Sequence, residues 1–170
     1  NMNEMKVPLC IPDITDEEVN SVSKVLMGGW LAHGEYNKKF ENLFAKTLGV
    51  KNAISVNSCT SAIEIALKAS DISKEVIIPS MTFVATANAV INSGCVPVFC
   101  DVDLSTRNLD ARSIKEKITP NTEAIIVVHY AGQPCNMDEI SRLCHDRKLL
   151  LIEDSAQTFG ARWNGKQAGS

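Results

Sequence analysis

Residues 123–154, "EAIIVVHYAGQPCNMDEISRLCHDRKLLLIED", decide the fold. Two short apolar runs, 123–130 and 149–154, flank a segment of helical periodicity at 136–148, which Asn136 caps. Apolar runs without polar alternation are typical of strands that are covered on both faces. A strand, a helix and a second strand in this order form a crossover between parallel strands. The stretch therefore predicts one unit of an α/β fold.

The same alternation of strand and helix extends toward the N-terminus. Strands are predicted at 52–57, 75–79 and 96–102, and helices at 60–70, 82–94 and 110–118. Two amphipathic helices precede them: a capping-box pattern of Thr15 and Glu18 opens the first, at 15–27, and Gly49 ends the second. The predicted class is α/β, with a doubly wound, mostly parallel sheet that follows two N-terminal helices.

Composition excludes several classes of function. The chain has 170 residues, is 45% hydrophobic and carries a net charge of -3, without the basic clusters that a nucleic-acid surface needs. No apolar run approaches the ~20 residues of a membrane span. Six cysteines without a C-x-x-C pair, and no export signal, indicate the reduced thiols of a cytoplasmic protein. The three histidines lack metal-ligand spacing, so no metal site is predicted.

Candidate site residues lie where the predicted strands end, because ligands of open α/β sheets collect at the carboxyl ends of the strands. In "NSCTSAIEIAL" (57–67), hydroxyl groups surround the start of a helix. Thr60 and Ser61 could bind an anion there together with free backbone N–H groups, or they could serve only as helix caps. Neither a dinucleotide fingerprint nor a P-loop is present.

Three other strand ends carry candidate groups. Asp101 and Asp103 form a D-x-D pair, for which turn formation is favoured over metal binding. Phe83 follows a strand end and either packs in the core or stacks on a flat cofactor. Glu153 and Asp154 are adjacent in a strand, so they point to opposite faces. One of them can face a site, where a protonated ring nitrogen or backbone N–H groups would compensate its charge.

Taken together, these segments resemble the DegT/StrS family of pyridoxal-phosphate-dependent nucleotide-sugar aminotransferases, which have fold type I. The resemblance starts at Val7 and follows the order of the family's motifs. The matching segments are "GGWLAHGEYNKKFE" (28–41), "NSCTSAIEIAL" (57–67), "IPSMTFVATANAV" (78–90), "PVFCDVD" (97–103), "VVHYAGQPCNMDEI" (127–140) and "IEDSAQTFGARWNGKQAGS" (152–170).

The resemblance implies a role for five residues. Thr60 and Ser61 would hold the cofactor phosphate, and Phe83 would stack on the pyridine ring. Asp154 would pair with the pyridine nitrogen and keep it protonated, and Gln157 would bond the ring hydroxyl.

The resemblance also sets expectations at the two ends of the chain. Trp30 and His33 are weaker candidates for the sugar side, and His129 and Tyr130 receive no role. The lysine that forms the Schiff base is expected after Ser170. Residues 1–170 would then be the N-terminal portion of the cofactor-binding large domain. The lysine segment and a C-terminal small domain would lie outside the chain, which would be inactive alone.

The implied activity is the transfer of an amino group, from glutamate or a similar donor, to a keto group of a nucleotide-linked sugar. This reaction would serve cell-surface polysaccharide or amino-sugar biosynthesis, in a cytoplasmic homodimer. One alternative is a pyridoxal-phosphate-dependent sugar dehydratase of the same family. Another is a catalytically incompetent half-chain that acts as a dimerisation or regulatory partner.

Overall fold

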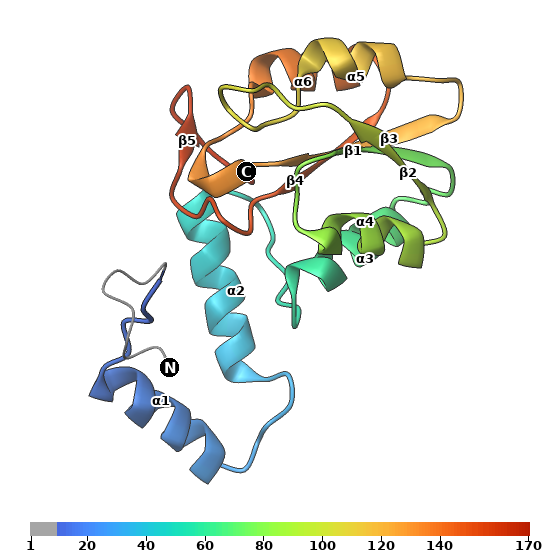
Figure 1. The fold of residues 1–170 in the computed structure, drawn as a ribbon. Helices are drawn as coiled ribbons and strands as arrows, with labels where there is room; N and C mark the ends of the chain where they lie inside the picture. Colours follow the sequence, from blue (N-terminus) through green and yellow to red (C-terminus); the bar gives the residue numbers. More distant parts are fainter. Residues whose placement is uncertain (1–9) are drawn as a thin grey trace, which may run out of the picture.

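The computed structural model describes residues 10–170, so the start of the resemblance at Val7 lies outside the described residues. Its central sheet has four parallel strands in the order β2-β1-β3-β4 (Figure 1). The strands are β1 (Glu75–Pro79), β2 (Val96–Cys100), β3 (Thr122–Val128) and β4 (Leu150–Asp154). All four carboxyl ends therefore meet at one edge of the sheet.

Residues 10–170 contain six α-helices. They are α1 (Asp16–Met27), α2 (Glu35–Leu48), α3 (Cys59–Ala69), α4 (Val84–Asn92), α5 (Ala111–Lys117) and α6 (Met137–Arg147). The pair α3 and α4 lies on one face and the pair α5 and α6 on the other (Figure 1). This arrangement confirms the predicted doubly wound α/β class, with two helices before the sheet.

The alternation of side chains along the strands separates two apolar cores. Ile77 and Ile125 pack toward α5 and α6, whereas Val76, Ile78 and Ile126 pack toward α3 and α4. All five side chains are fully buried. Burying a side chain of this size contributes about 1.5–3 kcal/mol, so the two cores hold the sheet to the helices on both of its faces.

The N-terminal helices form as their end signals predict. Thr15 and Glu18 make the reciprocal bonds of a capping box at the start of α1. Gly49 ends α2 in the left-handed conformation, with φ of 72°, which favours glycine. Neither helix contributes a buried residue, and α1 lies away from the sheet (Figure 1).

One local prediction is wrong, and one element was missed. Residues 52–57 form no strand, because no strand within residues 10–170 pairs with them; instead Ser55 bonds Glu41 of α2, and Ile54 is 81% exposed. The hairpin of β5 (Arg162–Trp163) and β6 (Lys166–Gln167) was not predicted. Its signal is the Asn-Gly dipeptide at 164–165, whose two positive φ angles suit a two-residue hairpin turn.

Candidate functional site

A hollow opens where β3 and β4 end. Three of the predicted cofactor residues, Phe83, Asp154 and Gln157, lie in its wall. The remaining wall residues are Thr82, Val128, His129, Tyr130 and Ala156. The topology brings these side chains together from three separate segments, because parallel strands present their carboxyl ends at one edge.

Asp154 is held by donors on both carboxylate oxygens. The Ala156 amide donates to Oδ1 at 3.2 Å, and the Cys59 thiol donates to the same oxygen at 3.4 Å. The Thr86 hydroxyl donates to Oδ2 at 3.2 Å. Sequence reasoning did not assign Cys59 or Thr86. Thr86 lies four positions after Thr82 in a predicted helix, and this spacing was the available signal.

The protonation of Cys59 follows from the same contacts. Burial of the thiol, the negative charge of Asp154 and the hydrogen bond to it raise the pKa of Cys59 to about 11. The thiol therefore stays protonated at neutral pH and acts as a donor to the carboxylate.

Glu153 points to the other face of the sheet, as the strand alternation predicts. Its Oε2 lies 2.8 Å from Nε2 of the fully buried His129 and accepts the Gly169 amide at 2.8 Å. The Cys135 amide donates to Nδ1 of the same histidine at 3.1 Å. Because Nδ1 is an acceptor, the ring proton is assigned to Nε2, which donates to Glu153. His129 thus ties the end of β3 to Glu153.

Gln157 is oriented by the loop that follows β3. Its Oε1 accepts the Ala131 amide at 3.0 Å, which leaves the Nε2 amide group as the donor available to a ligand. Asn108, which is buried, fixes this loop: it accepts the Tyr130 amide and donates to the carbonyls of Gln133 and Pro134. Asn108 was also missed, because only the tertiary fold brings it to the loop.

The N-terminus of α3 has the donors of an anion site. Ser58 is the N-cap: its oxygen accepts the Ser61 amide at 3.1 Å and its hydroxyl donates to the Ser61 oxygen at 3.1 Å. The Ser61 proton therefore remains available to a ligand. Within residues 10–170, the amides of Cys59 and Thr60 have no acceptor. Since Cys59 contacts Asp154, this helix end adjoins the hollow although Thr60 and Ser61 do not line it.

Trp30 and His33 lie apart from these residues. They belong to the loop between α1 and α2, where the Trp30 indole donates to the His33 carbonyl at 3.2 Å. Both line a different hollow, together with Tyr36, and Trp30 is 69% exposed. The described chain does not bring the two sugar-side candidates to Asp154.

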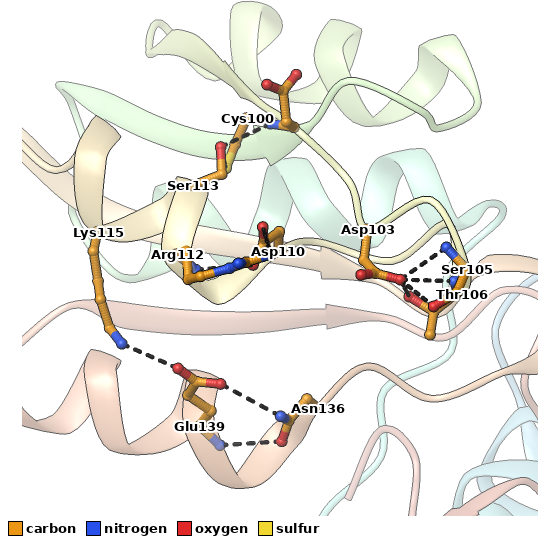
Figure 2. A network of polar contacts seen from close by, with 11 residues as sticks. Cys100, Asp103, Ser105, Thr106, Asp110, Arg112, Ser113, Lys115, Asn136 and Glu139 are labelled. Carbon is orange, nitrogen blue, oxygen red and sulfur yellow. Dashed lines mark hydrogen bonds and ion pairs between the residues drawn. The ribbon is translucent and has the colours of Figure 1, made fainter.

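The D-x-D pair forms a turn (Figure 2). Asp103 accepts the amides of Ser105 at 2.9 Å and Thr106 at 3.0 Å. The hydrogen bond from the Ser105 hydroxyl, followed by those from the two amides, lowers the pKa of Asp103. The Asp101 amide donates to the Ser113 hydroxyl at 3.1 Å. In residues 10–170, no three His, Cys, Asp or Glu side chains converge as metal ligands, and no helix is long and apolar enough to cross a membrane.

Comparison with known proteins relates the whole arrangement to one family. The profile of the DegT/DnrJ/EryC1/StrS aminotransferase family matches residues 12–170. The spore coat polysaccharide biosynthesis protein SpsC of Bacillus subtilis is 39% identical over 96% of this chain and 43% of its own length. The chain thus spans less than half the length of the curated relatives that it matches.

Solved structures show the same relation. An aminotransferase from Psychrobacter cryohalolentis superimposes with a TM-score of 0.90 at 39% identity, over 94% of this chain and 42% of that one. GDP-4-keto-6-deoxy-D-mannose-3-dehydratase from Escherichia coli, solved with bound hydrated PLP, superimposes with a TM-score of 0.88 at 33% identity. That match covers 96% of this chain and 44% of the dehydratase.

Proposed function

The chain belongs to the DegT/DnrJ/EryC1/StrS aminotransferase family, and from this premise we propose an activity for the whole protein. It transfers an amino group, from glutamate or a similar amino acid, to a keto group of a nucleotide-linked sugar, with pyridoxal phosphate as cofactor. The product serves polysaccharide or amino-sugar biosynthesis; the relative SpsC is named for spore coat polysaccharide biosynthesis. The observation that carries the proposal is the Asp154 carboxylate, which faces one hollow together with Phe83 and Gln157.

The residues present fit pyridoxal phosphate in both charge and hydrogen-bonding capacity. At the N-terminus of α3, the free amides and the hydroxyls of Thr60 and Ser61 suit a phosphate, which the helix dipole also favours. Phe83 is 76% exposed beside the hollow, so its ring is free to stack on a flat heterocycle. The Nε2 group of Gln157 suits the oxygen of the ring hydroxyl, and Asp154 suits a protonated ring nitrogen.

When bound, pyridoxal phosphate supplies an electron sink for the electron pair that remains when the donor's α-carbon loses its proton. Asp154 keeps a proton on the ring nitrogen, because a negative charge beside that nitrogen stabilises its protonated form. The three donors to Asp154 hold the carboxylate in place. Phe83 and Gln157 fix the plane of the ring, and Thr60 and Ser61 fix its phosphate end. These residues therefore bind and orient the cofactor and keep its ring nitrogen protonated, and none of them accepts the amino group.

The remaining parts of the proposed enzyme rest on the family resemblance. We place the Schiff-base lysine and a C-terminal small domain after Ser170 in the whole protein. Residues 1–170 then form the N-terminal portion of the cofactor-binding large domain. Trp30 and His33 stay predictions for the sugar side, and the cytoplasmic location and the homodimer also stay predictions.

A sugar dehydratase of the same family is the second candidate. It is supported by the 33% identity to the E. coli dehydratase, a match that covers 96% of this chain. A keto-sugar is the substrate of both reactions, but the products differ. The aminotransferase leaves nitrogen on the sugar, whereas the dehydratase removes a hydroxyl group from it.

Isotope labelling separates the two candidates. The full-length protein is incubated with pyridoxal phosphate, ¹⁵N-glutamate and a panel of nucleotide-linked keto-sugars, and the sugars are analysed by mass spectrometry. We expect ¹⁵N in the sugar product, with matching formation of 2-oxoglutarate. A deoxygenated sugar without ¹⁵N identifies the dehydratase, and unchanged sugars across the panel contradict both activities.

A further inference from the structure

A chain of two threonine hydroxyls ends on the Asp154 carboxylate. Thr82 and Thr86 lie with their Oγ1 atoms 2.9 Å apart, and Thr86 donates to Oδ2 of Asp154 at 3.2 Å. A hydroxyl has one proton to donate, so Thr82 must be the donor to Thr86. The bonds therefore run in one direction, from the wall of the hollow, where Thr82 lies, to the carboxylate.

The Thr86 hydroxyl is not needed for packing or for α4. Thr86 is 1% exposed, on the face of α4 that also buries Ala89 and Val90 in the apolar core. A valine would fill the same volume, and a buried hydroxyl is costly unless it is bonded. Threonines inside helices commonly bond a carbonyl one turn back, but here both polar contacts of Thr86 are side chains. The hydroxyl is thus dedicated to the threonine–carboxylate chain.

Thr86 also restrains an oxygen that nothing else in the described chain holds. Cys59 and Ala156 both donate to Oδ1, and Thr86 alone donates to Oδ2. Donors on both oxygens stop the carboxylate from turning about its Cβ–Cγ bond. Without the Thr86 bond, Oδ2 has no donor and the plane of the carboxylate is set from one side only.

We infer that Thr86 is a positioning residue, which orients the Asp154 carboxylate toward the nitrogen of the bound pyridine ring. This inference rests on the proposed function, because Asp154 needs that orientation only if the ring nitrogen is its partner. Thr86 itself lies behind Asp154 and does not line the hollow. Its effect therefore reaches the cofactor through the carboxylate.

The test uses the full-length holoprotein and the matched variants Thr86→Val and Thr86→Ser. Two quantities are measured: the rate of cofactor release, and the pH dependence of the visible absorbance of bound pyridoxal phosphate. For Thr86→Val we expect release to be about tenfold faster, since one hydrogen bond is lost, and the absorbance titration to shift by about one pH unit. Thr86→Ser retains the hydroxyl and should restore both values.

Thr122→Val provides the control for a purely structural effect. Thr122 is also buried, and its hydroxyl donates to a carboxylate, that of Glu75, at 3.3 Å. It lies at the opposite end of β3 from the hollow, so its loss should lower stability without moving the absorbance titration. If Thr86→Val binds cofactor with wild-type release and titration, or if Thr122→Val shifts both equally, the inference is wrong. Wild-type protein that binds no pyridoxal phosphate overturns the proposed function, and the role of Thr86 with it.

Discussion

Replacing Asp154 by asparagine tests the centre of the proposed site. The new side chain has the same shape, but it is neutral and cannot hold a proton on the ring nitrogen. We expect Asp154→Asn to fold, to bind pyridoxal phosphate more weakly and to lose nearly all transamination. The predicted loss is therefore chemical rather than structural.

The contacts of Asp154 indicate why the fold should survive. The amide oxygen can take the place of Oδ1 and still accept from Cys59 and Ala156. The new NH₂ group then faces Thr86, whose hydroxyl can accept from it and donate to Thr82, so the direction of the chain reverses. With every group still bonded, the free energy of unfolding should fall by no more than about 1 kcal/mol.

The cofactor has no such compensation. A hydrogen bond between charged partners contributes about 1.5–3 kcal/mol, so its loss should weaken cofactor binding by roughly 10- to 150-fold. Turnover should fall further, by at least about 100-fold at saturating cofactor, because the protonated ring is needed in every cycle.

Three measurements check this prediction in the full-length protein: thermal unfolding, equilibrium binding of pyridoxal phosphate, and formation of 2-oxoglutarate from glutamate. Glu153→Gln is the matched control, since a single oxygen of Glu153 accepts both His129 and Gly169 and an amide oxygen can replace it. Turnover at the wild-type rate in Asp154→Asn would refute the assignment of Asp154. Equal losses in the two variants would refute the assignment of one acid to each face of β4.

The other predictions concern the surroundings of the carboxylate. Combined Thr60→Ala and Ser61→Ala changes should weaken cofactor binding by a few kcal/mol at most, because the backbone amides remain; an unchanged dissociation constant would contradict a role for either hydroxyl in holding the phosphate. With a pKa of about 11 instead of 9.0, Cys59 should react with iodoacetamide at pH 8 on the order of 100-fold more slowly than an ordinary thiol. Asp154→Asn should speed that alkylation, and mass spectrometry of the labelled peptide measures both rates. Asn108→Ala should lower the free energy of unfolding by about 1–3 kcal/mol, since three backbone groups lose their partner, and a denaturant titration showing no change would contradict this.

The strands and helices of the sheet could be predicted because their signals are local. "EVIIP" is bounded by polar residues and forms β1, and Asn136 and Asp110 cap the helices that follow them. The segment 52–57 has the same kind of apolar pattern, yet a strand also needs a neighbour to pair with. The apolar pattern of a segment shows that its side chains tend to be buried. Whether the segment pairs with another strand is decided by the tertiary fold, so the prediction of a strand at 52–57 failed.

The residues of the site could likewise be predicted where their signals are local. Strand ends direct attention to Thr60, Ser61, Phe83 and Asp154. The family resemblance adds Gln157 and gives all five residues their roles. The groups that hold these residues could not be predicted. The bond between Cys59 and Asp154 joins residues 95 positions apart, and Asn108 reaches a loop more than twenty positions away. These long-range hydrogen bonds depend on how α3 and α5 pack against the sheet, and no local pattern in the sequence specifies that packing.

Because Glu153 and Asp154 alternate along β4, the proposed site is sensitive to the number of residues in this strand. If one residue is deleted inside the strand while its pairing with β3 is kept, every later side chain moves to the opposite face. The glutamate would then enter the hollow, and the aspartate would face His129. In evolution and in protein engineering alike, insertions and deletions should therefore accumulate in the exposed turn at 119–121 rather than within β4.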